Sequence, residues 1–361
     1  MRILHVITSL QTGGAEKLMV DLLPRICERG HQVELCVFDG ARTPFFDQLE
    51  DTGIRIHWFQ KGGSIYNPLN IYRLWKLMNK DWDIVHTHNT APQLFAALGG
   101  VLCSVVLVTT EHTTSNRRRD WKWYRPIDEW MYRKYSSVIS ISLATTQELQ
   151  KYVSIKCPIY TIPNGIDVEK YNNAAPVKRS DIGCNKNSFL LMMVAGFRYQ
   201  KDQDSIIRSI KSLPDNIQLC LVGDGERRKV CEELAESLGV SDKVIFTGLR
   251  TDVSNVLKTA DVVVMSSHYE GFGLAAVEGM AAGKPVIASD VEGLADIVRN
   301  FGLLFPQGDA NALASIVAQL YNNKDFYDKV VCDCKKRAND FDISNMVDGY
   351  IRVYKSLCPK K

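Results

Sequence analysis

Short apolar runs rich in β-branched residues alternate with amphipathic segments along most of the chain. Apolar runs bounded by turn residues are typical of buried parallel strands, and segments with a period of about 3.6 residues are typical of helices. In the first half, the predicted strands are Ile3–Thr8, Gln32–Phe38, Ile54–Trp58, Ile84–Thr87, Val105–Thr109, Ser137–Ser142 and Ile159–Pro163. The predicted helices between them include Ala15–Glu28, Leu69–Asn79, Ala91–Gly99 and Leu143–Tyr152.

The polar stretch Asn172–Ser188 interrupts this alternation and is interpreted as a linker. The second half then predicts strands at Phe189–Ala195, Ile217–Val222, Val244–Thr247, Asp261–Ser266, Val286–Ala288 and Leu303–Phe305. Its predicted helices lie near Asp204–Leu213, Glu226–Leu238, Asp252–Lys258, Gly273–Ala282 and Asn311–Tyr321. The remaining segment, Phe326 to Lys361, is helical in pattern.

Two such series predict an α/β chain with two doubly wound, Rossmann-like domains that face a cleft. We expect the first domain at residues 1–172, the second at 173–340 and a C-terminal helix within 341–361. Ligands of doubly wound sheets bind beyond the carboxyl ends of the strands, so the candidate chemistry is sought at the strand ends.

Composition narrows the function classes. The 361 residues are 45% hydrophobic and carry a formal net charge of +3, and no aromatic–basic RNA motif is present, so nucleic-acid binding is not expected. The ten cysteines are scattered, which favours reduced thiols in the core. With no signal-peptide pattern and no apolar run near the length of a membrane span, we expect a cytoplasmic enzyme.

The most informative motif joins the end of a predicted strand to the start of a helix. Glu270 and Glu278 lie eight residues apart, with the turn Gly271-Phe272-Gly273 between them and Leu274 opening the helix. A helix N-terminus offers unpaired N–H donors to an anion. Two carboxylates on either side of backbone N–H groups that can bind a phosphate are suited to a nucleotide-linked sugar.

Three further strand ends in the first half carry polar or glycine residues. Gly13 and Gly14 open a helix, either as a tight turn or as a phosphate- or hydroxyl-binding loop, without the third glycine of a dinucleotide fingerprint. His86 and His88 share one face of an extended chain, which favours cleft-lining side chains over a metal pair, because no third ligand lies nearby in sequence. His112 is either a general base or hydroxyl-binding group, or a hydrogen-bonded surface histidine.

In the second half, Arg198 and Lys201 follow a strand, where they can hold a diphosphate without a metal ion. Gly223 ends the next strand and allows the backbone to approach a ligand. The backbone at Leu249, after the strand that follows, can hydrogen-bond a base edge or form a tight turn.

The basic and aromatic stretch Arg117–Arg125 is either a solvated loop or a patch that meets anionic lipid head groups or a lipid-linked anionic acceptor.

These residues, in this order, resemble the retaining glycosyltransferases of family 4, which have the two-domain GT-B fold. The resemblance covers nearly the whole chain, and the segment from Glu270 to Glu278 is its most specific part. One departure is that the family usually has Gly-Arg two positions before Arg198, where this chain has Ala195-Gly196.

The resemblance implies a role for each candidate. Glu278 would hold the ribose hydroxyls and Glu270 would contact the donor sugar, while Lys201, with Arg198, would neutralise the leaving diphosphate. The backbone of Gly271, Phe272, Gly273 and Leu274 would meet the sugar and diphosphate, and Gly13, Gly14 and His112 would line the phosphate, sugar and acceptor side. The C-terminal helix would pack back on the first domain.

The function implied is retaining, metal-independent transfer of a hexose from a nucleotide sugar, UDP-linked in most of the family, to a hydroxyl of a glycan or lipid-linked acceptor in cell-envelope polysaccharide synthesis. No cofactor and no metal site are expected. A sugar-nucleotide epimerase with the same architecture is the main alternative. The missing fingerprint disfavours a nicotinamide-dependent oxidoreductase, and the residues Glu270, Glu278 and Lys201 together disfavour an inactive binding module.

Overall fold

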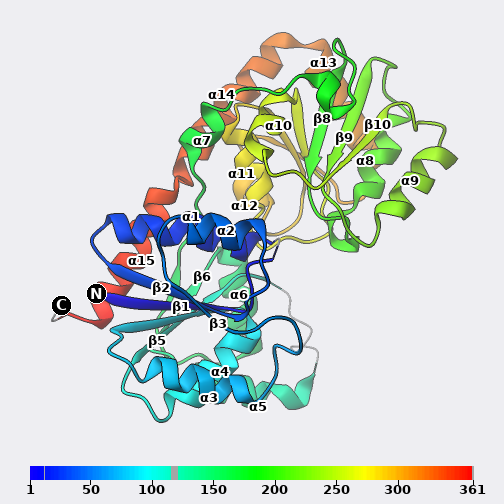
Figure 1. The fold of residues 1–361 in the computed structure, drawn as a ribbon. Coiled ribbons are helices and arrows are strands. Elements are labelled where there is room, and N and C mark those ends of the chain that lie inside the picture. The colour runs from blue at the N-terminus through cyan, green and yellow to red at the C-terminus, as the bar shows by residue number, and fades with distance from the viewer. Residues whose placement is uncertain (12, 115–120, 360–361) are drawn as a thin grey trace. The chain divides into compact units, whose positions relative to one another are not determined.

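A computed structural model describes residues 1–11, 13–114 and 121–359, apart from the side chain of Lys122. The chain divides into two compact units (Figure 1). Unit 1 comprises Met1–Gly165 together with Ile343–Lys361, and unit 2 comprises Ile166–Asp342. Each unit is a parallel sheet with helices on both faces, so the predicted α/β class with two Rossmann-like domains is confirmed.

Within the described part of unit 1, seven parallel strands form one sheet. The strands run parallel because a helix follows each of the first six and returns the chain to the end of the sheet at which the strand began. In sheet order the strands are β3 (Ile56–Gln60), β2 (Gln32–Asp39), β1 (Arg2–Ile7), β4 (Ile84–His88), β5 (Val106–Glu111), β6 (Ser137–Ser140) and β7 (Ile159–Thr161). The pairing of β1 with β4 places His5 directly beside His86.

The helices of unit 1 cover two faces, each with its own apolar cluster. They are α1 (Gly14–Glu28), α2 (Pro44–Glu50), α3 (Leu69–Met78), α4 (Thr90–Gly100), the short 3-10 helix η2 (Lys122–Tyr124), α5 (Arg125–Tyr132), α6 (Leu143–Tyr152) and α15 (Ile343–Leu357). On one face, α15 packs beside α1, and its Val347 and Tyr350 lie in the same core as Leu22. On the other face, α3, α4 and α5 cover the sheet.

Within the described part of unit 2, six parallel strands form the second sheet. In sheet order they are β10 (Val244–Gly248), β9 (Ile217–Val222), β8 (Phe189–Val194), β11 (Val262–Met265), β12 (Val286–Ser289) and β13 (Leu303–Phe305). All residues of β9, β11 and β12 are buried, as expected for central parallel strands covered on both faces.

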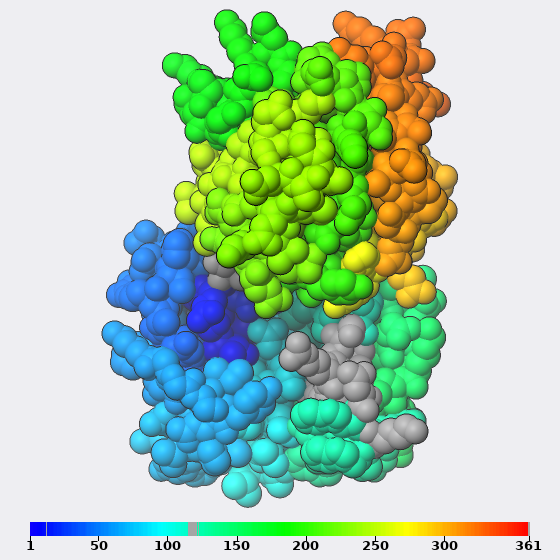
Figure 2. Space-filling model, turned by 90° about the vertical axis from the view of Figure 1, so that its right-hand side faces the viewer, coloured from blue at the N-terminus to red at the C-terminus, as the bar shows by residue number. Residues whose placement is uncertain are grey.

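The helices of unit 2 are α7 (Val168–Asn172), η3 (Arg179–Ile182), η4 (Tyr199–Lys201), α8 (Gln203–Ile210), α9 (Arg228–Ser237), α10 (Val253–Thr259), α11 (Leu274–Ala281), α12 (Ala295–Val298), α13 (Ala310–Asn322) and α14 (Lys324–Asp340). The segment from β9 through β10 is yellow-green in Figure 2 and includes α9. This helix buries Cys231 and Ala235 against the sheet side and exposes Lys229, Glu232 and Glu233.

The structure differs from the sequence prediction in several short helices and in the boundaries of the units. Four short helices, α2, α5, α7 and α12, were not predicted. The boundary between the units falls after Gly165, earlier than the expected position at residue 172, because α7 packs on α10 and α11 of unit 2. The second boundary falls after Asp342 rather than after residue 340.

No helix in the described residues is both long enough and apolar enough to span a membrane.

Unit 1 buries histidines in the middle of its sheet. His5 on β1 and His86 and His88 on β4 have no exposed surface. Burial lowers the pKa of His5 to about 3 and holds the pKa values of His86 and His88 well below the ordinary value. Burial disfavours the cationic form, so these imidazoles are neutral in the folded protein at pH 7.

This burial predicts acid sensitivity of unit 1. As the pH falls below about 6.5, the unfolded chain protonates His5 while the folded chain does not, so the unfolded state binds more protons. The stabilisation is therefore complete above pH 6.5 and is lost as the pH falls towards about 3. For one such histidine the loss is on the order of a few kcal/mol.

The measurement is urea unfolding at pH 7 and pH 4.5, followed by tryptophan fluorescence, because all six tryptophans lie within residues 1–165 of unit 1. His5→Phe is expected to lose less stability on acidification than the wild type, since the carboxylates that titrate in this range are common to both. Equal losses in the two proteins would contradict the assignment.

Candidate functional site

The sheet of unit 2 changes direction between β8 and β11. The chain leaves β8 towards β9 on one side, and β11 lies on the other side. At such a switch point the loops that follow the two strands diverge to opposite faces and leave a crevice at the carboxyl edge, which is where ligands of doubly wound sheets bind. Residues 195–202 follow β8, and residues 266–273 follow β11.

Lys201 and Glu270 come from these two loops and contact each other. The Lys201 Nζ donates a hydrogen bond to Glu270 Oε2, and both side chains are largely shielded from solvent. The switch point therefore holds one ammonium and one carboxylate in direct contact.

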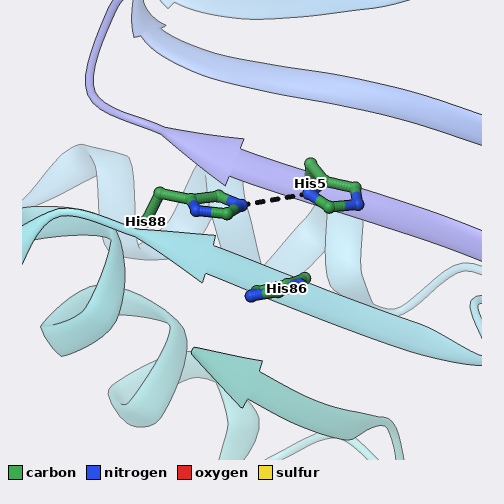
Figure 3. A group of neighbouring side chains, drawn as sticks. All are labelled: His5, His86 and His88. Atoms are coloured by element: carbon green, nitrogen blue, oxygen red, sulfur yellow. Dashed lines mark hydrogen bonds between the residues drawn. The ribbon is translucent and has the colours of Figure 1, made fainter. Parts of the chain in front are cut away.

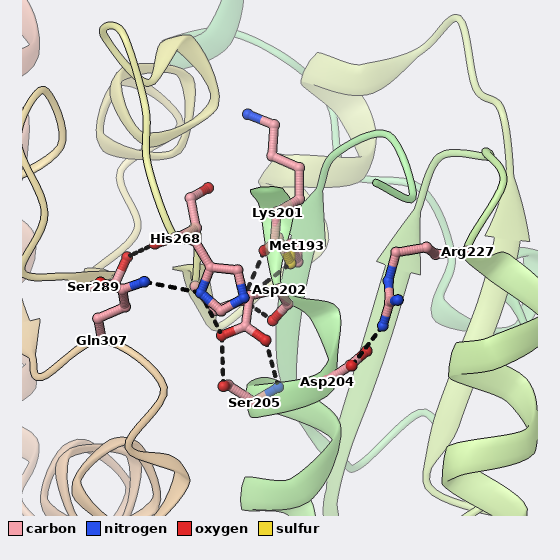
Figure 4. Close-up of polar contacts among 11 residues, drawn as sticks. Met193, Lys201, Asp202, Asp204, Ser205, Arg227, His268, Ser289 and Gln307 are labelled. Atoms are coloured by element: carbon pink, nitrogen blue, oxygen red, sulfur yellow. Dashed lines mark hydrogen bonds and ion pairs between the residues drawn. The ribbon is translucent and has the colours of Figure 1, made fainter. Parts of the chain in front are cut away.

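The backbone beneath Lys201 is fixed by buried hydrogen bonds (Figure 4). Asp202 adopts a left-handed conformation with φ of 50° and caps α8, since its carboxylate accepts from the Ser205 N–H at 3.3 Å and the Ser205 Oγ at 2.6 Å. Ser266 Oγ donates to the carbonyls of Asp202 at 2.7 Å and Lys201 at 3.2 Å. In Figure 4 the Lys201 ammonium points away from this cluster, so the network holds the backbone of Lys201 without pairing with its ammonium.

His268 supports the same loop from β11. Its backbone N–H donates to the Gln200 carbonyl at 2.9 Å, its ring lies 4.8 Å from that of Tyr199, and its Nδ1 lies 3.0 Å from Gln307 Nε2. The same Nδ1 lies 3.7 Å from Asp202 Oδ2. Burial raises the pKa of the Asp202 carboxyl, and the donors from Ser205 partly offset this.

The N-terminus of α11 lies against Glu270. A Cβ built on Gly273 would lie 3.6 Å from Glu270 Cγ, and Gly273 has a φ of 91°, which favours glycine. The first α11 bonds in the described residues join the N–H groups of Ala276 and Val277 to the Gly273 carbonyl. The N–H groups of Leu274 and Ala275 precede these bonds and remain available to an anion.

Two neighbours hold this turn in place. The Phe272 side chain is buried edge-on against Phe341, with ring centroids 5.4 Å apart, so only its backbone can meet a ligand. Gly293 lies under Glu270, where a Cβ would come within 2.2 Å of the Glu270 carbonyl oxygen. Gly293 was not among the residues predicted from the sequence.

Glu278 is buried on α11 and is held by a tyrosine that the sequence analysis missed. Tyr171 Oη on α7 donates to Glu278 Oε1 at 2.6 Å. Within the described residues, no donor reaches the second oxygen, Oε2. One oxygen thus fixes the carboxylate, and the other can accept from a ligand hydroxyl.

The loops after β8 and β9 are joined by backbone bonds. Phe197 N–H donates to the Asp224 carbonyl at 3.0 Å, and a Cβ on Gly223, which has a φ of 138°, would lie 2.1 Å from the Ala195 carbonyl oxygen. Gly223 is therefore required for loop–loop packing. After β10, the Leu249 side chain is 66% exposed, so a role in recognition there falls to its backbone or to an apolar surface.

Arg198 lies on the exposed side of the β8 loop, at the N-cap of η4. Within the described residues, no acidic side chain pairs with its guanidinium. Its charge is thus available, in the same loop as Lys201.

Unit 1 places its candidates at an equivalent position. Its sheet switches direction between β1 and β4, and Gly13 and Gly14 follow β1 at the start of α1. A Cβ on Gly13 would lie 2.2 Å from Glu16 Oε2, so the Glu16 carboxylate already covers this helix start. An anion that binds at Gly13 and Gly14 requires Glu16 to turn away.

His112 follows β5 and is partly exposed. Its Nε2 lies 2.9 Å from His88 Nδ1, and burial lowers its pKa to about 4. The interpretation of His86 and His88 as cleft-lining residues is wrong, because neighbouring strands and α15 bury both completely.

Residues 117–120 of the basic stretch Arg117–Arg125 lie outside the described residues, which resume at Trp121. Trp121 and Trp123 are 52% and 66% exposed and stack with centroids 5.7 Å apart.

Comparisons with known proteins identify the family of the chain. A family model described as "Glycosyltransferase Family 4" matches residues 12–170, and one described as "Glycosyl transferases group 1" matches residues 175–338. The putative glycosyltransferase EpsD of Bacillus subtilis is 27% identical over 350 residues, covering 91% of this chain and 90% of that protein. The Escherichia coli UDP-Gal:alpha-D-GlcNAc-diphosphoundecaprenol alpha-1,3-galactosyltransferase is 27% identical over 79% of this chain and 78% of that protein.

Among solved structures, Anabaena Alr3699/HepE in complex with UDP and glucose superposes with a TM-score of 0.88 at 22% identity, covering 99% of this chain and 100% of that one. This likeness shows the fold. The two family models together match residues 12–170 and 175–338, which make up most of the chain, so it belongs to the family 4 glycosyltransferases, which share the GT-B fold.

Proposed function

We propose that this glycosyltransferase is a retaining, metal-independent enzyme that moves a hexose from a UDP-linked donor to a hydroxyl of a glycan or lipid-linked acceptor in cell-envelope polysaccharide synthesis. Unit 2 would bind the donor and unit 1 the acceptor.

The contact between Lys201 and Glu270 carries this proposal. It lies at the switch point of unit 2, with Glu270 against the N-terminal end of α11. A donor diphosphate would share the Lys201 ammonium with Glu270 and accept from the first N–H groups of α11. Glu270 would then lie beside the sugar that the diphosphate carries.

The buried carboxylate of Glu278 supports a nucleoside at the same site. Tyr171 occupies one of its oxygens, and the other would accept from a ribose hydroxyl. The relatives indicate which nucleotide to test first: the E. coli relative is named for UDP-Gal and an undecaprenol-linked acceptor, and the Anabaena structure contains UDP.

The proposed reaction is a front-face displacement. The bond between the sugar C1 and the β-phosphate oxygen breaks, the acceptor oxygen bonds to C1 on the same face, and the acceptor proton passes to the departing phosphate. The products are the glycoside and the nucleoside diphosphate. Lys201, Arg198 and the α11 N-terminus would stabilise the negative charge that grows on the leaving group, which is the work that a divalent cation does in other transferases.

We extend the proposal to an enzyme acting at the inner face of the membrane. The exposed, stacked Trp121 and Trp123, which belong to the basic sequence stretch Arg117–Arg125, would meet an anionic head-group surface. The epimerase alternative is not favoured, since the relatives named above are glycosyltransferases.

A donor screen tests the proposed function. Purified protein is mixed with UDP-sugars and other nucleotide sugars, with and without a glycan or polyprenyl-diphosphate sugar acceptor, and release of nucleoside diphosphate is measured. Acceptor-dependent release of UDP that persists in EDTA, and a product with the anomeric configuration of the donor, are expected. Donor conversion without acceptor would indicate the epimerase, and activity lost in EDTA and restored by Mg²⁺ would refute metal independence.

Lys201→Ala is expected to lower kcat by a factor of about 100 or more, because the cation acts on charge that develops in the transition state. Lys211→Ala, which removes an exposed lysine from the end of α8 in the same unit, is the matched control and should retain activity. Steady-state kinetics give kcat for both variants, and equal kcat values would show that Lys201 does not act on the diphosphate.

Tyr171→Phe is expected to weaken UDP binding several-fold, since it frees Glu278 from the bond that orients its carboxylate. Glu278→Ala should weaken binding further. Tyr327→Phe removes another tyrosine hydroxyl of unit 2, which donates to the Asp261 carbonyl, and should leave affinity unchanged. Calorimetric titration with UDP compares the three variants, and wild-type affinity in Glu278→Ala would exclude the ribose role.

A further inference from the structure

Unit 1 contains a continuous line of hydrogen bonds that begins at His112 and ends on α15. Four histidines and one tyrosine form it: His112 after β5, His88 and His86 on β4, His5 on β1, and Tyr354 on α15. Figure 3 shows the central step, in which the rings of His88 and His5 point at each other edge to edge.

Each link joins specific atoms. His112 Nε2 lies 2.9 Å from His88 Nδ1, and His88 Nε2 lies 3.0 Å from His5 Nδ1. Tyr354 Oη lies 3.4 Å from His5 Nε2 and 2.5 Å from His86 Nδ1. His86 Nε2 lies 2.7 Å from Thr110 Oγ1, which in turn lies 3.2 Å from Tyr350 Oη.

Both ring nitrogens of His5, His86 and His88 are therefore occupied. Among the described residues, the Nδ1 of His112 is the one ring nitrogen of the line with no partner. His112 is also the one histidine of the line that is partly exposed, so the line has a single end that solvent or a ligand can reach.

The four imidazoles are neutral at pH 7. Burial lowers the pKa of His112 to about 4 and of His5 to about 3, and holds the pKa values of His86 and His88 lower than normal. Glu111 is the charged neighbour that opposes this at His112, and its carboxylate is already engaged by Gln93 and Tyr132.

Because the imidazoles are neutral, the hydrogen bonds of the line all run in the same direction. A neutral imidazole donates from one nitrogen and accepts at the other, so fixing one histidine fixes all of them through the Tyr354 hydroxyl. The Tyr354 hydroxyl is fully buried, and among the described residues His5 and His86 are its hydrogen-bond partners, so it donates its proton within the line. Under that condition two arrangements satisfy every link. Either all four histidines carry the proton on Nε2 and Tyr354 donates to His86, or all four carry it on Nδ1 and Tyr354 donates to His5.

We propose that the line holds His112 as the neutral Nε2–H tautomer, so that its bare Nδ1 accepts a hydrogen bond from a hydroxyl of the sugar or acceptor. The Nε2–H form is the intrinsically preferred tautomer of neutral histidine, and in this arrangement all four histidines adopt it. The 2.5 Å contact suits a tyrosine hydroxyl that donates to the His86 lone pair. His88, His5 and Tyr354 are then positioning residues. The ligand assignment rests on the proposed function, whereas the tautomer does not.

A metal site is the competing interpretation, since ring nitrogens of His5, His86 and His88 lie within 4.8 Å of one another. A metal ion needs lone pairs that converge on one point. The hydrogen bonds instead run in sequence from one ring to the next, with Tyr354 and Thr110 bound to His86. The hydrogen bonds between the side chains thus explain why the rings lie close together, and no metal ion is needed.

The tautomer is measured by long-range ¹H–¹⁵N NMR of histidine-labelled full-length protein at pH 7 without substrate. The expected spectrum shows His112 with a protonated Nε2 and an unprotonated, strongly downfield Nδ1. A wild-type His112 that is protonated on Nδ1 or on both nitrogens would overturn the proposal.

Tyr354→Phe breaks the line between His86 and His5, and Tyr350→Phe is the matched control, because this tyrosine is equally buried on α15 but lies beyond Thr110. Tyr354→Phe should mix the two tautomers at His112 and lower kcat/KM about ten-fold, the effect of losing one oriented hydrogen bond. Tyr350→Phe should leave the His112 spectrum and kcat/KM unchanged. Tryptophan fluorescence at the assay temperature confirms that both variants are folded.

An unchanged His112 spectrum in Tyr354→Phe would also refute the positioning role. Titration of the wild type with Zn²⁺ alone should show no stoichiometric binding, and stoichiometric binding that shifts His5, His86 and His88 together would establish the metal site instead. If the tautomer is as proposed but no nucleotide sugar is turned over, the proposed function fails while the hydrogen-bonded line stands.

Discussion

In each sheet the strand order reverses at one switch point, and that point determines where a ligand can bind. In unit 2 the strand order reverses between β8 and β11, and the loops that follow strands at such a point diverge and leave a crevice at the carboxyl edge. Lys201 and Glu270 meet there, and Asp202, Ser205 and Ser266 hold the backbone beneath them. The proposed donor site depends on this geometry more than on any single side chain.

A second constraint acts inside unit 1, where polar side chains lie in strands that are buried on both faces. Leaving such a group without a partner is costly, because water cannot reach it. His5, His86 and His88 satisfy one another and reach α15 through Tyr354. The pairing thereby connects the middle of the sheet to the partly exposed His112.

Hydrophobic periodicity was sufficient to predict the strands of both sheets, because parallel strands buried on both faces are continuous apolar runs. It missed α7, whose single buried residue in a polar segment leaves no periodic pattern. The omission hid Tyr171, although Glu278 itself was found from its spacing to Glu270. The role of His86 and His88 was also missed, since which polar residues of a strand are buried depends on helices distant in sequence, here α15.

Unit 1 is assembled from two stretches of chain that flank unit 2, and this has a consequence for biosynthesis. Residues 1–165 leave the ribosome first, yet Ile343, Val347 and Tyr350 of their core are translated only after the whole of unit 2. Until then, α1 lacks the helix that packs beside it. Unit 2 is continuous, so it can complete its folding before unit 1 does, which would reverse the usual N-to-C order and would leave an apolar face of the nascent unit 1 uncovered.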